Sequence, residues 1–316
     1  MPYTISYVYL LNRNDTEFMK KINDPKKHHY VPQFYLRKFH CVDDENKVPT
    51  ISRHDPYLIK KKSSISRIGY EDYLYKISDK NIEQCIEKNL NLAIETPISQ
   101  SETWKKIDNG TPELLNESDK LVIYMFMRHL ESRNIETLEF LKSEQIRVLN
   151  TEFREEYSDD ERRMHEQISS TSHGVNKFFM GMSNNLDQYV EEYKRASISI
   201  FGSNIPVRTS TAPVINVPIH TFQNTEFNLK ETTKWLPLCP KFGAMLFLND
   251  SYCDFGRFHV VEDEVIRTLN RLYLVQLCNS RTVRHMIAKD EFIFDDFKWS
   301  GIQIDTLNPR KFKYPN

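Results

Sequence analysis

Hydrophobic and polar positions divide this chain into three parts. From residue 81 to about residue 195 apolar side chains recur at helical spacing, as at Ile82, Ile86, Leu90 and Ala93. On either side of this block the apolar runs are short, and prolines or turn residues separate them. The pattern therefore predicts an α+β protein in which a central helical block lies between two β-containing ends.

The N-terminal part, residues 1–80, is predicted to hold a small antiparallel sheet with one short helix packed on it. Alternating apolar residues predict strands at 47–54 and 70–77, and an acidic turn at residues 43–46 precedes the first. Residues 3–11 are rich in β-branched and aromatic types, which fit a strand or a short helix.

The central and C-terminal parts, residues 81–195 and 196–316, complete a single domain that we expect to span residues 1–316. The longest predicted helix covers residues 121–157. The C-terminal part is predicted to contain short strands and one closing helix at residues 268–289. The predicted strands lie at residues 198–201, 214–219, 244–248 and 257–261.

One segment, residues 26–39, concentrates titratable and aromatic side chains. Val31 precedes a proline and is biased toward an extended conformation, and Pro32 suits the first position of a helix. A helix from Pro32 to Phe39 places Tyr35, Leu36 and Phe39 on one buried face. Gln33 and Arg37 then share a second face of the same helix.

His28 and His29 precede this helix, where free backbone N–H groups would favour an anion. Imidazole exchanges protons near neutral pH, and arginine binds phosphate bidentately. We therefore name His28, His29, Gln33 and Arg37 as candidate catalytic residues. The alternative is that His29 and Arg37 bond to backbone carbonyls and fix a buried helix start.

The net charge is −1, but positive charge is concentrated near the motif. Residues 20–67 contain twelve Lys or Arg and five Asp or Glu. Basic and aromatic side chains together suit phosphate contact and base stacking, although such runs also form ordinary solvated surfaces. The candidate substrate-binding residues in this part are Tyr30, Lys38, Lys60, Lys61 and Lys62.

Composition excludes several classes of site. Only eight glycines are present and no glycine-rich phosphate loop occurs. Five scattered cysteines without C-x-x-C spacing argue against a disulfide framework or a structural zinc site, so a divalent metal would need His and carboxylate ligands. The longest apolar run, residues 121–127, is too short to cross a bilayer, and no signal-peptide pattern is present. We expect a cytoplasmic protein without a membrane segment.

The run His-His-Tyr-Val-Pro-Gln-Phe-Tyr-Leu-Arg-Lys-Phe at residues 28–39 resembles the signature of a bacterial family known as domain of unknown function 4238. Arg128, the Pro-Leu-Cys-Pro run at residues 237–240 and Asn270 fit the same family, and the resemblance covers roughly residues 26–290. Relatives tend to show Thr-Ser-Asp-Asn-Pro-Val where this chain has Thr-Ser-Thr-Ala-Pro-Val, so a carboxylate is missing at Thr211. The resemblance implies a site location and no particular reaction.

The two ends of the chain are expected to pack together. This would bring the motif close to residues 209–214, to residues 237–240 and to residue 270. Thr209, Ser210 and Asn270 are therefore candidates for substrate binding, and the family resemblance adds Arg128.

Three functions fit these observations. The first is a nuclease or phosphodiesterase, for which an imidazole, an arginine and a basic track supply the base, the phosphate clamp and the binding surface. The second is a transferase or glycohydrolase acting on NAD or another nucleotide. The third is a non-catalytic nucleic-acid-binding or protein-binding component of a bacterial antiphage defence system. An HNH-type nuclease, with His29, Asn46 and His54 in order, is disfavoured because Pro56 interrupts the helix it requires.

Overall fold

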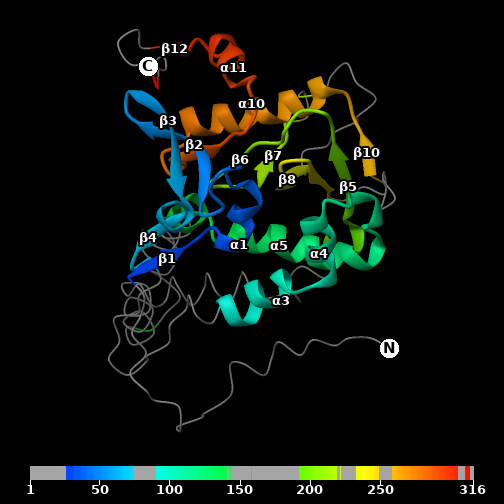
Figure 1. The fold of residues 1–316 in the computed structure, drawn as a ribbon. Coiled ribbons are helices and arrows are strands. Elements are labelled where there is room, and N and C mark those ends of the chain that lie inside the picture. The colour runs from blue at the N-terminus through cyan, green and yellow to red at the C-terminus, as the bar shows by residue number, and fades with distance from the viewer. Residues whose placement is uncertain are drawn as a thin grey trace.

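The structure is a computed structural model that describes residues 26–74, 90–140, 143, 158, 192–218, 221, 233–248, 258–304 and 310–313. Helices and three sheets are present, which confirms the α+β class (Figure 1). The expected element at residues 3–11 lies outside the described residues. Within the described parts of the chain, no helix is long and apolar enough to cross a membrane.

The largest sheet joins the two ends of the chain. Its six strands pair antiparallel throughout, and the strand order is β12-β13-β3-β2-β11-β6. In sequence order the strands are β2 (Lys47–His54), β3 (Tyr57–Ser64), β6 (Thr209–Ser210), β11 (His285–Ile287), β12 (Gln303–Ile304) and β13 (Lys311–Lys313). The prediction of a small sheet made of N-terminal strands alone is therefore wrong, because the C-terminal strands β6, β11, β12 and β13 belong to the same sheet.

A second sheet has five strands in the order β10-β5-β9-β8-β7, of which only the β10–β5 pair is parallel. Strand alternation gives it two buried faces: Ile198 and Ile200 belong to one hydrophobic cluster, and Phe201 belongs to another. Its strands are β5 (Ser197–Gly202), β7 (Ile215–Asn216), β8 (Lys234–Cys239), β9 (Phe242–Phe247) and β10 (Phe258–Val260).

Helices cover both faces of this five-stranded sheet. Figure 1 shows α10 (Asp263–Asn279) on one side, with α4 (Glu102–Asn109) and α5 (Lys120–Ser132) on the other. Ser101 caps α4 by accepting a hydrogen bond from the Trp104 backbone N–H at 3.1 Å. The shorter helical segments are Asn91–Glu95, α3 (Thr96–Ser99), Pro112–Leu114, Glu117–Asp119 and α11 (Ile293–Trp299).

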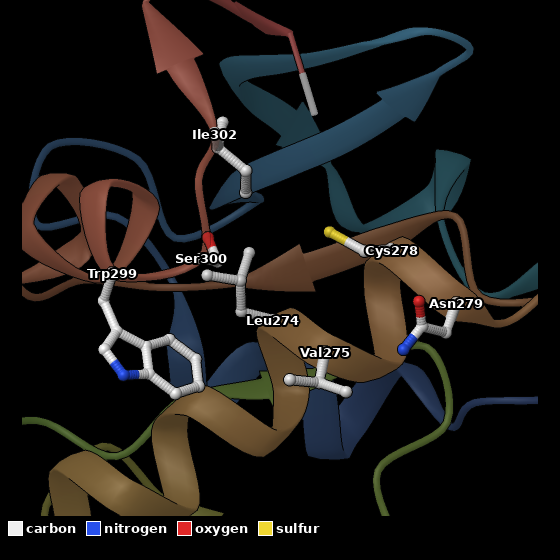
Figure 2. Close-up of a pocket in the computed structure, with 7 residues that line it drawn as sticks. All are labelled: Leu274, Val275, Cys278, Asn279, Trp299, Ser300 and Ile302. Carbon is white, nitrogen blue, oxygen red and sulfur yellow. The ribbon is translucent and has the colours of Figure 1, made fainter. Parts of the chain in front are cut away.

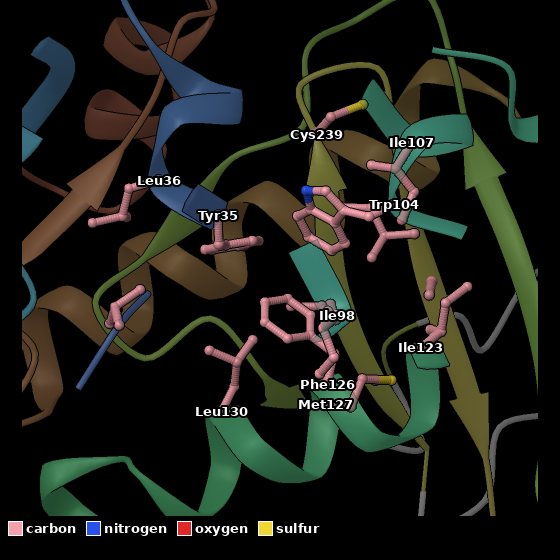
Figure 3. Close-up of a cluster of buried hydrophobic side chains, with 14 of the residues drawn as sticks. Tyr35, Leu36, Ile98, Trp104, Ile107, Ile123, Phe126, Met127, Leu130 and Cys239 are labelled. Atoms are coloured by element: carbon pink, nitrogen blue, oxygen red, sulfur yellow. The ribbon is translucent and has the colours of Figure 1, made fainter. Parts of the chain in front are cut away.

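The motif forms a strand, a tight bend and a short helix. Strand β1 (Lys27–His29) pairs antiparallel with β4 (Tyr70–Asp72), and α1 (Gln33–Leu36) continues into a 3₁₀ turn at Arg37–Phe39. The predicted helix is confirmed, and Tyr35, Leu36 and Phe39 are fully buried as its periodicity requires. Figure 3 shows Tyr35 and Leu36 in the cluster that also contains Trp104, Phe126 and Cys239.

Other boundary predictions differ from the structure. The strand predicted at 47–54 is confirmed by β2, but the strand predicted at 70–77 ends at Asp72 in β4, and residues 75–77 lie outside the described part. The helix predicted at 121–157 is interrupted after Ser132, where α5 ends; residues 135–140 are helical again, and most of residues 141–157 lie outside the described part. The helix predicted at 268–289 is wrong beyond Asn279, because residues 285–287 pair with β2 as strand β11.

Candidate functional site

His28 and His29 lie in strand β1 instead of at the open mouth of a helix. Their register partners in β4 are Glu71 and Tyr70. The backbone N–H groups of Tyr30 and Val31 both donate to the carbonyl of Gly69, at 2.9 and 3.1 Å. These two donors next to the histidines are therefore used within the protein and are not free to bind an anion, while the anion site at the start of the helix stays a prediction.

The two imidazoles differ in environment. His28 is buried with 1 % of its surface exposed, whereas His29 is half-buried. The Gln33 side-chain amide donates to Nε2 of His29 at 3.3 Å, and the Tyr70 ring lies 5.7 Å from the His29 ring between centroids. His29 and Gln33 are thus adjacent, a contact that the sequence analysis did not predict.

Burial lowers the pKa of His29 from 6.5 to about 4, and the positive charges of Arg133 and Lys27 act in the same direction. A hydrogen bond with the backbone of Ser66 opposes the shift. His29 is therefore neutral at physiological pH. A base with so low a pKa is weak, because general-base catalysis is most effective when the pKa lies near the working pH.

The guanidinium that reaches His29 belongs to Arg133, at the carboxyl end of α5. Arg133 is completely buried and donates to the backbone carbonyl of His29 and to Oε1 of Glu95. Its Nη1 also lies 3.2 Å from Nε2 of His129, and that ring nitrogen lies 3.5 Å from Oε1 of Glu95. This buried network fixes the backbone of β1 against α5.

Sequence reasoning did not place Glu95, His129 or Arg133 at the site. His129 is fully buried. The one available signal was the spacing of His129 and Arg133, which are four residues apart and therefore share a helix face. Glu95 lies 38 positions before Arg133, and no local pattern joins the two.

The basic residues of the motif helix do not converge on the histidines. Arg37 is exposed, and Lys38 forms an ion pair with Asp108 of α4. Tyr30 is buried with 6 % of its surface exposed. Within the described residues, the proposed combination of His29 with an Arg37 phosphate clamp thus gains no supporting contact.

The predicted approach of the two chain ends is confirmed at one contact. The Tyr35 hydroxyl and Thr209 Oγ1 are 2.7 Å apart in the core, although 174 positions separate the residues. Ser210 Oγ lies 2.9 Å from the Ala212 carbonyl oxygen and 2.7 Å from Oε1 of Gln276, and its single hydrogen is donated toward these two acceptors. Both predicted substrate-binding hydroxyls are buried and hydrogen-bonded inside the protein.

Arg128 and Asn270 also make internal contacts. Arg128 pairs with Glu131 at 2.8 Å and with Glu192. Asn270 accepts from the Arg208 backbone N–H at 2.8 Å and donates to the Pro206 carbonyl at 2.9 Å. These contacts support a structural role for both side chains.

Thr211, where relatives were expected to carry an acid, is also buried. It keeps 2 % of its surface exposed. Its hydroxyl oxygen has no hydrogen-bond partner among the described residues.

Lys60, Lys61 and Lys62 lie on strand β3, so their side chains alternate between the two faces of the six-stranded sheet. Lys60 places its ammonium 4.6 Å from the centre of the Phe294 ring, and Lys62 pairs with Asp43. Lys61 points to the opposite face. The three lysines therefore do not form one continuous basic surface. The sequence analysis did not predict strand β3.

Lys61 belongs to a basic sheet face that sequence reasoning did not assemble. Cross-strand register and alternation place its members on one side of β2, β3, β11 and β13. We call it the Lys61 face, and it consists of His54, Tyr57, Lys61, His285, Lys311 and Lys313. Exposed Arg284 precedes His285 at its edge.

The imidazoles of the Lys61 face respond to its positive charge. Burial is the main cause that lowers the pKa of His285 from 6.5 to about 4, and Lys61, His54 and Arg284 lower it further. The pKa of His54 is lowered by burial, Lys61 and Arg284, and only Asp55 raises it. The Asp55 carboxylate is itself paired with Arg53 at 2.8 Å. The face therefore combines ammonium groups with neutral imidazoles.

A separate pocket of ≈ 310 Å³ lies between the second half of α10 and the segment after α11 (Figure 2). Burial raises the pKa of the Cys278 thiol in its wall to about 11, so the thiol is protonated at neutral pH. The pocket shares no residue with the motif or the Lys61 face. Its lining consists of Leu274, Val275, Cys278, Asn279, Trp299, Ser300 and Ile302.

The sequence left open whether the site binds a divalent metal, which would need His and carboxylate ligands. In the part of the chain that the structure describes, no group of three or more His, Cys, Asp or Glu side chains is placed to hold a metal ion. The HNH arrangement is also disfavoured by the fold, because His54 leads through a hairpin into strand β3 instead of a helix.

Family comparison agrees with the signature at residues 28–39. The family described as "Protein of unknown function (DUF4238)" matches residues 27–290. The chain belongs to this family. The DUF4238 match starts at the first residue of β1 and includes α5, β2, β3, β11 and the five-stranded sheet, whereas α11, β12 and β13 lie beyond it. No curated protein and no solved structure matches the chain.

Proposed function

We propose that this protein binds nucleic acid through the Lys61 face. The observation that carries the proposal is that the positive charges of this face are exposed and have no carboxylate partner among the described residues. Lys61 and Lys313 on this face, and Arg284 at its edge, are exposed, and no ion pair joins them to a carboxylate among the described residues. Unpaired ammonium and guanidinium groups on one surface are suited to phosphate, because binding releases the counterions of the nucleic acid.

The neighbouring basic residues provide an internal comparison. Lys62, one position from Lys61, is paired with Asp43, and Lys47 of β2 is paired with Asp44 at 2.8 Å. Both lie outside the Lys61 face. Lys62 and Lys47 are thus neutralised within the protein, whereas no carboxylate among the described residues pairs with Lys61 or Lys313.

Charge reversal of adjacent lysines tests the proposal. Lys61→Glu should weaken binding of a fluorescein-labelled oligonucleotide about tenfold and reduce the slope of log affinity against log salt by about one. Lys62→Glu is the matched control, because it makes the same change one residue away on the other face. Fluorescence anisotropy at several salt concentrations measures both. Equal losses in the two variants, or none in either, would refute the assignment.

Phosphodiester hydrolysis is a second candidate function. It is favoured by the position of the half-buried His29 imidazole, which lies beside the amide of Gln33 and near the charge of Lys27; with a pKa of about 4, His29 would act there as a weak base. Incubation of the protein with RNA and with single- and double-stranded DNA, with and without divalent metals, tests it. Cleavage that disappears in His29→Ala and persists in Lys62→Glu would support hydrolysis. Inertness of the wild-type protein toward every substrate would exclude it under those conditions.

The cellular setting is part of the same proposal. Cys41, Cys239 and Cys278 are free thiols, which supports a reducing cytoplasm. A nucleic-acid sensor or effector in bacterial antiphage defence would fit such a protein, by functional analogy alone.

A further inference from the structure

The Lys61 face carries rings as well as positive charges. Tyr57 begins β3, and its register neighbours are His54 on β2 and Lys313 on β13. An imidazole, a phenol and an ammonium group therefore follow one another across three adjacent strands. Such strands lie about 4.8 Å apart, so the three side chains form a continuous row.

A second row lies two residues further along the strands. It contains His285, Ser52, Ile59 and Lys311 in register. The Lys311 ammonium lies 5.4 Å from the centre of the Tyr57 ring, which connects the two rows. Tyr57 thus has basic side chains beside it, and the residue is partly exposed.

The state of the imidazoles favours stacking. The nearby cations and burial keep His285 neutral at physiological pH, since its pKa is about 4. A neutral imidazole adds a planar ring without adding a charge. The face then separates two roles: lysines contact phosphates, while Tyr57 and His54 offer ring surfaces to bases.

These two roles discriminate between forms of nucleic acid. A duplex exposes its phosphates but keeps its bases stacked and paired, so it would use the lysines alone. An unpaired strand can place a base on an aromatic ring while its phosphates contact the flanking cations. An open sheet face also presents neither a helix nor a protruding two-stranded ribbon to a major groove.

We infer that the Lys61 face binds single-stranded nucleic acid in preference to duplex, with an unpaired base on Tyr57 and phosphates at Lys61, Lys311 and Lys313. The inference rests on the proposed function, because it names the form of nucleic acid that this surface takes. Two of the lysines, Lys311 and Lys313, lie beyond the part of the chain that the DUF4238 family matches.

The test compares three labelled probes on the full chain: a mixed-sequence single strand, the blunt duplex of the same sequence, and the single strand with its central bases removed. The wild-type protein should bind the intact single strand about tenfold more tightly than either of the other two, since stacking of one base has roughly that effect. Anisotropy titrations at one salt concentration provide the affinities.

Variants at Tyr57 assign the preference to its ring. Tyr57→Ala should lose about tenfold in affinity for the single strand and less than twofold for the duplex. Tyr57→Phe keeps the ring and should retain the preference. Circular dichroism and thermal unfolding check that both variants are folded. If Tyr57→Ala does not fold, the test depends on Tyr57→Phe, which should retain the preference for the single strand.

The outcomes separate the inference from the function on which it rests. If no probe binds, or if Lys61→Glu and Lys62→Glu behave alike, the proposed function fails. If all probes bind equally and Lys61→Glu weakens each of them, the basic surface is correct and the single-strand preference is wrong. A preference that survives Tyr57→Ala in a folded protein would also overturn the inference.

Discussion

Replacing Arg133 by methionine tests whether the buried network supports the motif. Arg133 has no exposed surface and, among the described residues, contacts the His29 carbonyl, the Glu95 carboxylate and the His129 ring. Methionine is similar in length but cannot donate a hydrogen bond. The substitution would leave the Glu95 carboxylate, which is 8 % exposed, without its cation.

The expected loss follows from this geometry. Removing one partner of a buried ion pair lowers the free energy of unfolding by about 3–5 kcal/mol, because the remaining charge stays desolvated. The free energy of unfolding of a folded domain is only about 5–15 kcal/mol, so Arg133→Met should leave a marginally stable protein. Its melting temperature should fall by roughly 10 °C.

Urea unfolding followed by circular dichroism and by tryptophan fluorescence measures the change. Trp104 and Trp235 are buried and report on the core. The double variant Glu95→Gln with Arg133→Met removes both charges and should recover part of the loss. Lys62→Ala, which breaks an exposed ion pair, is the control and should leave the unfolding curve unchanged. A loss below about 1 kcal/mol in Arg133→Met would refute the idea that this network fixes β1.

Three further predictions concern stability. Gly69→Ala should lower the free energy of unfolding by at least about 2 kcal/mol in chemical denaturation, because the φ angle of Gly69 is +63° and an added Cβ would lie 2.8 Å from the Val31 Cβ. An unchanged free energy of unfolding would contradict this prediction. Tyr35→Phe removes the hydrogen bond to Thr209 and should cost about 1–2 kcal/mol in the same assay, so an unchanged midpoint would show that the bond contributes little. His285 has a pKa of about 4 when folded and 6.5 as a reference, so the unfolded chain binds its proton first on acidification. The contribution of His285 to the free energy of unfolding is complete above pH 6.5 and falls by up to about 3 kcal/mol as the pH drops to 4. The variant His285→Asn should therefore flatten a plot of the free energy of unfolding against pH in this range. An unaltered slope would oppose the assignment.

Several elements follow from local sequence alone. Pro32 and the spacing of Tyr35, Leu36 and Phe39 predicted a short helix with one buried face, and the structure contains it. Strand β2 has the bounds predicted from its residues. In both cases the signal lies within a few neighbouring positions, where backbone preferences and side-chain periodicity act directly.

Strand β3 and strand β11 were not predicted, because their local patterns point elsewhere. Three consecutive lysines at 60–62 suggested a solvated basic run, yet pairing with β2 makes the segment a strand and divides the lysines between two faces. Residues 285–287 continue a helical pattern but pair with β2 on one side and β6 on the other. Hydrogen bonding to distant strands outweighed local propensity at both places.

The sequence by itself determined the family, the motif helix and the α+β class of this protein. Only the tertiary structure decided what the motif histidines contact and where unpaired positive charge is exposed. Arg133 reaches the His29 carbonyl across 104 positions of sequence, and the Lys61 face draws on both ends of the chain. Contacts between such distant residues depend on how sheets and helices pack, and spacing along the chain carries no record of that packing.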